Sequence, residues 1–169
     1  MLGVHKAIKS DKKQLAFVRA SQIIANYFMP FMAALTLNHN QGCNMYPKEF
    51  YLVPEEIFRL GNANTPKLSH VRPRDVDTIQ INGITVIVAN GKGISVFDKE
   101  GINQSPMNGW VWRFRPNTQP PLGLRLVQDK PHHYCIAPNQ NMPIDKYKGL
   151  LEEMALKASR VFKKEGKVV

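Results

Sequence analysis

Arg59, Ser95 and His133 are the three residues whose side chains could contact a ligand. Arg59 lies in the apolar segment EIFRLGN, and its forked guanidinium group suits phosphate. Ser95 lies in the short apolar run ISVF, which glycines flank on both sides. His133 can hydrogen-bond to a sugar hydroxyl or to a phosphate. Each also has a structural alternative: an edge-strand arginine in water, a serine bonded to nearby backbone, and a hydrogen-bonded structural histidine.

Motifs for several common classes of site are missing from the sequence, namely GxGxxG, the P-loop, HExxH, GxSxG and paired CxxC. A lone GxG at 91–93 has no long helix pattern directly after it, so we expect no Rossmann site. His132 and His133 are adjacent, and adjacent side chains diverge in a strand, so we expect no metal site. Cys43 and Cys135 are far apart and form no disulfide framework. Cys135 lies in an apolar run and is expected to be a buried thiol rather than a nucleophile.

The sequence is basic, with 23 lysines and arginines against 13 acidic residues and a formal net charge of +10. Such a charge attracts polyanions, including nucleic acid and phosphate-bearing cofactors, although lysines near the two ends of a chain are often simply solvated. The segment WVWRFR at 110–115 places its aromatic side chains on one face and its arginines on the other. Aromatic rings could stack on bases while arginines reach phosphates. A non-enzymatic nucleic-acid-binding module is therefore an alternative function, and a buried aromatic face is the structural alternative.

Apolar periodicity predicts helices near the N-terminus. Residues 11–29 have the spacing of an amphipathic helix, and Pro30 can begin a second, short helix. We expect residues 1–45 to form a helical extension and residues 46–165 to form the main domain. The basic, acid-poor segment 1–40 could also serve delivery or organelle targeting. Its apolar part is too short and interrupted to span a membrane.

The remainder of the chain predicts a run of strands closed by a helix. In TIQINGITVIVAN, two β-rich runs flank Asn82-Gly83, the preferred pair of a type I′ hairpin turn. An apolar stripe from Tyr147 to Phe162 predicts a C-terminal helix. The fold class expected is therefore α+β. Further short strands are expected at EIFRL (56–60), ISVF (94–97), WVWRFR (110–115), LRLVQ (124–128) and HYCIA (133–137).

Four motifs occur in a characteristic order between residues 56 and 162. They are Phe58-Arg59, then GISVFDKEG at 93–101, then a Pro-Pro to Gln-Asp segment at 120–129, then HYCIAPNQNM at 133–142, followed by the terminal helix. In this order they resemble the small ADP-ribosyltransferase-like toxins exemplified by a Pseudomonas type VI secretion effector.

The resemblance implies a split, mixed β-sheet core that cradles NAD, with helices at both ends. It implies an enzyme that transfers ADP-ribose from NAD to an intracellular target, releases nicotinamide and arrests growth. It further implies action in the cytoplasm of a target cell after delivery by a secretion system. The partners implied are NAD as substrate, a cognate immunity protein and a target that is protein or nucleic acid.

The resemblance also assigns roles to individual residues. Arg59 would pair with the NAD phosphates, Ser95 would orient the nicotinamide ribose, and His133 would complete the catalytic set. The residues implied to line the NAD cleft are Arg59, Gly93, Ser95, Phe97, Gln128 and Tyr134.

No glutamate lies in the late strand HYCIAP, where many ADP-ribosyltransferases have one. Departure of nicotinamide builds positive charge on the ribose, and a nearby carboxylate would stabilise that charge. Asp129 is the nearest candidate acid in the sequence.

Overall fold

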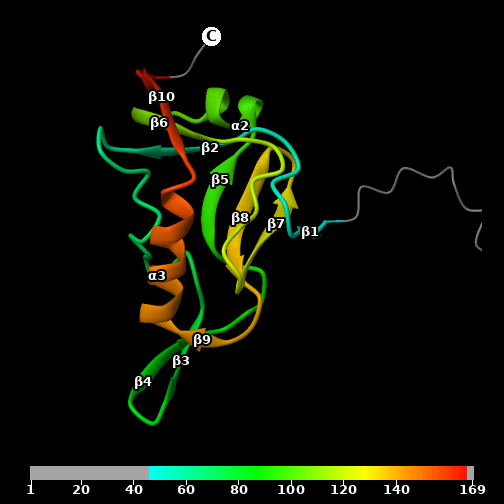
Figure 1. Ribbon diagram of the computed structural model, residues 1–169, viewed down its shortest axis with the longest axis vertical. Helices are drawn as coiled ribbons and strands as arrows, with labels where there is room; N and C mark the ends of the chain where they lie inside the picture. Colours follow the sequence, from blue (N-terminus) through cyan, green and yellow to red (C-terminus); the bar gives the residue numbers. More distant parts are fainter. Residues whose placement is uncertain (1–45, 167–169) are drawn as a thin grey trace, which may run out of the picture. The chain divides into compact units, whose positions relative to one another are not determined.

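The computed structural model describes residues 46–166, and within them it contains a mainly antiparallel β structure with two helices (Figure 1). The helices expected over residues 11–29 and 30–37, and Cys43, lie outside the described residues. The α+β class is confirmed for the part of the chain described. The strands are β1 (Lys48–Phe50), β2 (Ile57–Gly61), β3 (Thr78–Ile81), β4 (Ile84–Ile87), β5 (Ile94–Phe97), β6 (Gly109–Phe114), β7 (Leu124–Lys130), β8 (His133–Pro138), β9 (Met142–Pro143) and β10 (Ser159–Lys164). The helices are α2 (Lys99–Gln104) and α3 (Ile144–Ala155).

Seven strands form the larger sheet in the order β1-β7-β8-β5-β2-β6-β10, and β3, β4 and β9 form a second sheet. Every pairing in the larger sheet is antiparallel, so the expectation of a mixed sheet is wrong. The join between β5 and β2 has one paired position, Phe58 opposite Phe97, whereas β2 and β6 have five. The sheet is therefore held weakly at its centre, between β5 and β2.

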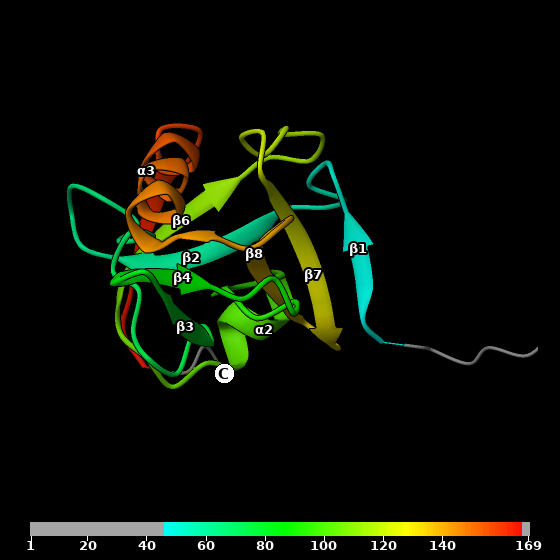
Figure 2. The ribbon, with the colours of Figure 1, turned by 90° about the horizontal axis from the view of Figure 1, so that it is seen from below.

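The two faces of this sheet carry different amounts of apolar packing. α3 covers one face, where Tyr147, Leu151 and Met154 join the larger buried cluster. α2 lies on the opposite side of β2 (Figure 2), where Ile102 packs with Phe58 in a small cluster. We call these the α3 face and the α2 face. Because successive side chains of a strand point to opposite faces, alternate residues of each strand pack in the larger core on the α3 face or lie on the α2 face.

The β3–β4 hairpin confirms the prediction made from Asn82-Gly83. Both turn residues have positive φ, 51° for Asn82 and 78° for Gly83, as a type I′ turn requires. The register places Ile81 opposite Ile84, so the turn has two residues. The local turn signal therefore predicts the hairpin correctly, and β9 pairs with its second strand.

The prediction of one helix from Tyr147 to Phe162 is wrong in its second half. α3 ends at Ala155, and Ser159–Lys164 is strand β10, which pairs with β6. Hydrogen bonding to the free edge of β6 outweighs the helical apolar spacing, because tertiary context overrides local propensity. Lys164, which the helix would have exposed, is 2% exposed, and its Nζ donates to the Ser105 carbonyl at 2.6 Å.

No helix in residues 46–166 is both long enough and apolar enough to cross a membrane.

Candidate functional site

Ser95, Phe97 and His133 lie together on the α2 face of the sheet. In the β5–β8 ladder Ser95 is opposite Cys135 and Phe97 is opposite His133, so all four side chains point to the same side. The rings of Phe97 and His133 meet edge to face, with centroids 5.3 Å apart. The alternation expected from the sequence thus places the predicted serine, phenylalanine and histidine in one group.

Asp129 joins this group through an irregularity in β7. The register of β7 against β8 shifts between Gln128 and Lys130, which leaves Asp129 as the extra residue. Such a bulge redirects a side chain, and here the Asp129 carboxylate contacts Nδ1 of His133. The acid nearest in sequence to the late strand is therefore also in contact with the predicted histidine.

Two hollows lie beside this group of side chains. One, of about 410 Å³, is lined by Phe97, His133 and Lys130 together with α2 residues. The other, of about 230 Å³, is lined by Asp129 and Cys135 with residues of the loop before β5. The larger volume lies within the range of roughly 300–1,000 Å³ that holds small-molecule ligands. Lys130 adds positive charge at its rim, which favours a ligand that carries phosphate.

Arg59 lies in the middle of the sheet, because β2 is placed between β5 and β6. The alternative of an edge-strand arginine in water is therefore wrong. Its side chain follows Ile57 onto the α3 face, and its Nη1 donates to the main-chain carbonyl of Ser95 at 2.6 Å. Burial lowers the pKa of Arg59, and the neighbouring Arg72 lowers it further. Arg59 thus contacts the backbone of Ser95 and not its hydroxyl.

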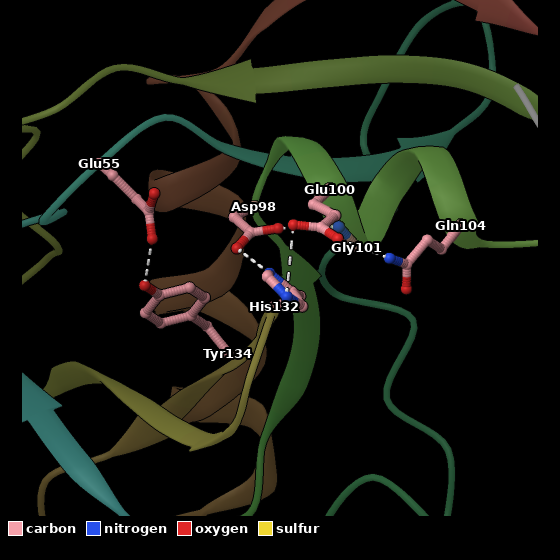
Figure 3. A network of polar contacts seen from close by, with 7 residues as sticks. All are labelled: Glu55, Asp98, Glu100, Gly101, Gln104, His132 and Tyr134. Atoms are coloured by element: carbon pink, nitrogen blue, oxygen red, sulfur yellow. Dashed lines mark hydrogen bonds and ion pairs between the residues drawn. The ribbon is translucent and has the colours of Figure 1, made fainter. Parts of the chain in front are cut away.

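Tyr134 and Gln128 are opposite each other in the β7–β8 ladder and lie on the α3 face. The Tyr134 hydroxyl donates to the Glu55 carboxylate (Figure 3). Burial raises the pKa of Tyr134 above its usual value, and the hydrogen bond to Glu55 raises it further. The predicted residues therefore divide between the two faces, with Arg59, Tyr134 and Gln128 on the face opposite Ser95 and His133.

Gly93 is in close contact with β8. A methyl group at this position would overlap the carbonyl group of Ile136 and lie 2.9 Å from Cα of Ala137. The main chain of Gly93 therefore lies close to the main chain of strand β8, which leaves no space for a side chain.

His132, which the sequence interpretation left without a role, connects the β7–β8 turn to α2 (Figure 3). Its Nδ1 lies 2.8 Å from Asp98 and its Nε2 lies 3.4 Å from Glu100. Asp98 also caps α2 by accepting from the amide of Gly101 at 2.8 Å. The hydrogen bond with Asp98 is the main reason that the pKa of His132 is raised. In the sequence, the only indication of this contact is Asp98, an aspartate at the N-cap position just before α2.

Cys135 is 7% exposed, which confirms the expectation of a buried cysteine. Burial, followed by the nearby charge of Asp129, raises its pKa to about 11. The thiol is therefore protonated at neutral pH and is a poor nucleophile.

The aromatic side chains of β6 already have partners within the chain. Phe114 is fully buried in the larger cluster. The indole N–H of Trp112 donates to the Asn62 carbonyl at 2.9 Å, and the guanidinium of Arg160 lies 4.6 Å from the ring centre of Trp110. These contacts favour the structural reading of WVWRFR over a surface that stacks bases.

A family model described as Tse2 ADP-ribosyltransferase toxin matches residues 46–162. The matched range takes in every strand and helix described above except the last two residues of β10. No curated protein matches the chain. No solved structure matches it either.

Proposed function

The chain belongs to the Tse2 ADP-ribosyltransferase toxin family, and from this membership we propose that it transfers ADP-ribose from NAD to an intracellular target and so arrests growth. NAD is the substrate that the family implies. The catalytic domain is residues 46–165, and the weak join between β5 and β2 is the split of an ADP-ribosyltransferase-like core. Residues 1–45 form a separate extension for delivery or targeting, so deletion of residues 1–40 changes location without removing toxicity.

The observation that carries the proposal is that Ser95, Phe97 and His133 share the α2 face, where Phe97 and His133 line one hollow and Asp129 lines another. Ser95 orients the ribose next to nicotinamide through its hydroxyl, and Phe97 packs beside the ring. His133 hydrogen-bonds to the ribose, and its contact with Asp129 fixes the orientation of the imidazole.

In the reaction, the bond between the ribose and the nicotinamide nitrogen breaks, and its electron pair moves to that nitrogen. Positive charge then builds on the ribose until a nucleophile of the target adds to it and loses its proton to solvent. The Asp129 carboxylate, held beside His133, lowers the energy of this charge. It takes the place of the glutamate that the late strand lacks.

The resemblance suggests that Arg59 pairs with the NAD phosphates, but its side chain lies on the face opposite Ser95 and His133, so in this proposal Arg59 acts on the site through the main chain. Its contact with the Ser95 carbonyl holds the main chain of Ser95 in place. Tyr134 and Gln128, which the resemblance also assigns to the cleft, lie on the α3 face, and Gly93 packs against β8, so they support the site from behind rather than line it.

The test is incubation of the full chain with labelled NAD and a bacterial lysate, with label read separately on protein and on nucleic acid. With the wild type we expect label in either the protein fraction or the nucleic-acid fraction. With the Ser95→Ala and His133→Ala variants we expect that label to be lost. Ser159→Ala, an exposed serine of β10, is the matched control and should label as the wild type does. Label that is unchanged in both site variants contradicts the site.

Expression in bacteria provides the second readout. The wild type should arrest growth and Ser95→Ala should relieve the arrest. Normal growth with abundant folded wild-type protein would exclude a toxin that acts inside that cell. Rescue of growth by a co-expressed protein from the same source would identify the immunity partner. The proposed delivery route is a type VI secretion system, and it is tested by measuring whether the host secretes the protein.

A further inference from the structure

Asp129, His133 and Cys135 form a cluster of potential metal ligands on the α2 face. Each offers one ligand atom, a carboxylate oxygen, a ring nitrogen and the thiol sulfur, and these three atoms all lie within 4.8 Å of one another. No sequence motif marks such a site, because its three members come from two strands that are paired in the sheet.

The fold brings the three side chains together in a defined way. His133 and Cys135 are two residues apart in β8, so they point to the same side. Asp129 reaches them because the bulge in β7 turns it to that side. Both strands are inside the seven-stranded sheet, which holds the donors in place.

The surroundings of the cluster are closed on one side and open on the other. Cys135 is buried, the His133 side chain is 13% exposed and the Asp129 side chain is 42% exposed. Asp129 and Cys135 also line the hollow of about 230 Å³. Three protein donors beside a hollow leave room for a water or another ligand in a fourth position.

We propose that Asp129, His133 and Cys135 bind a divalent transition-metal ion of the zinc class. One sulfur, one imidazole nitrogen and one carboxylate oxygen are the donors that zinc takes in proteins, and a thiolate in the set disfavours magnesium and calcium. On binding, the Cys135 thiol gives up its proton to the solvent. The inference is argued from the three donors alone and does not rest on the proposed function; an ion held here would occupy the Asp129 and His133 groups that the proposed transfer uses, so the two are alternative states of the same side chains.

The test uses the full chain, reduced and freed of metal with a chelator that is then removed. Cobalt(II) is the probe, because a cobalt–thiolate bond absorbs in the near ultraviolet and a tetrahedral site gives strong visible bands. We expect one equivalent of cobalt to bind with both signals, and zinc to displace it. Absence of the thiolate band in the wild type overturns the proposal.

Variants decide which side chains bind the ion. Cys135→Ser should abolish the thiolate band, and Asp129→Asn should weaken binding about tenfold or more. Asp129 is at the surface, so its variant keeps the test valid if Cys135→Ser fails to fold. Cys43→Ser and His70→Ala are controls that should bind cobalt as the wild type does. A thiolate band that persists in Cys135→Ser, or is lost in Cys43→Ser, overturns the site, as does unchanged affinity in Asp129→Asn.

Discussion

At the scale of single residues, Arg59 has the most consequential contact near the site. The β5–β2 join has one paired position, so the bond from Arg59 Nη1 to the Ser95 carbonyl adds a link that the ladder does not supply. A charged donor to a neutral carbonyl makes a strong hydrogen bond. The position of Ser95 therefore depends on a side chain from the opposite face of the sheet.

Replacing Arg59 by methionine tests this link. Methionine has a similar length but no donor, so the Ser95 carbonyl loses its partner and we expect a loss of about 1–3 kcal/mol in the free energy of unfolding. Urea denaturation measures the change. Arg74→Met, at an exposed position, is the control and should leave the midpoint unchanged. An unchanged midpoint in Arg59→Met would show that the bond does not hold β5 to β2.

At the scale of elements, two glycines show how differently the same residue is used. Gly93 lies where β5 begins to pack against β8, and a methyl group there would overlap the Ile136 carbonyl. Gly149 lies on the exposed side of α3, and nothing lies within 4 Å of the equivalent methyl position. One glycine is needed by its strand, whereas the other weakens its helix.

Alanine at these two positions should change stability in opposite directions. Gly93→Ala should lower the free energy of unfolding by about 1–3 kcal/mol, because the backbone of β8 has to move. Gly149→Ala should raise it by about 0.5–1 kcal/mol, because alanine favours a helix interior. Thermal and urea unfolding of the two variants form a matched pair. Equal stability of Gly93→Ala and wild type would contradict the close packing of β5 on β8.

The elements also separate what the sequence can predict from what it cannot. The hairpin at Asn82-Gly83 follows from a local turn signal, and the shared face of Ser95 and Phe97 follows from alternation within one strand. The end of α3 cannot be predicted from the sequence in this way. Ser159–Lys164 becomes a strand because the edge of β6 is free to pair with it. The contact of Asp129 with His133 depends on a bulge, and no pattern in the sequence marks it.

At the scale of the whole described domain, the two faces of the large sheet have separate tasks. The larger buried cluster lies under α3 and supplies most of the stability. The small cluster beside α2 leaves the hollows and the polar side chains of the candidate site. Changes on the α3 face should therefore act mainly on stability, whereas changes at Ser95 or His133 should act mainly on binding and turnover.

The Arg72–Asp75 pair ties the stability of this domain to pH. Asp75 is 8% exposed and accepts from the Arg72 guanidinium at 2.8 and 2.9 Å and from the Arg72 amide at 3.0 Å. Burial alone would raise the pKa of Asp75, but the bonds from Arg72 outweigh it and the pKa is lowered. The ionised form is thus favoured in the folded state.

Asp75→Asn should therefore destabilise the protein at neutral pH and lose its effect in acid. A lowered folded-state pKa contributes stability that is complete above the unfolded value, roughly pH 4, and is lost as pH falls through the folded value. We expect a difference of about 1–3 kcal/mol from the wild type at pH 7 that shrinks steadily below about pH 4. Urea midpoints measured across this range give the difference, with Glu153→Gln on the exposed side of α3 as the control. A difference that stays constant into acid would mean that Asp75 stabilises the fold by packing rather than by its charge.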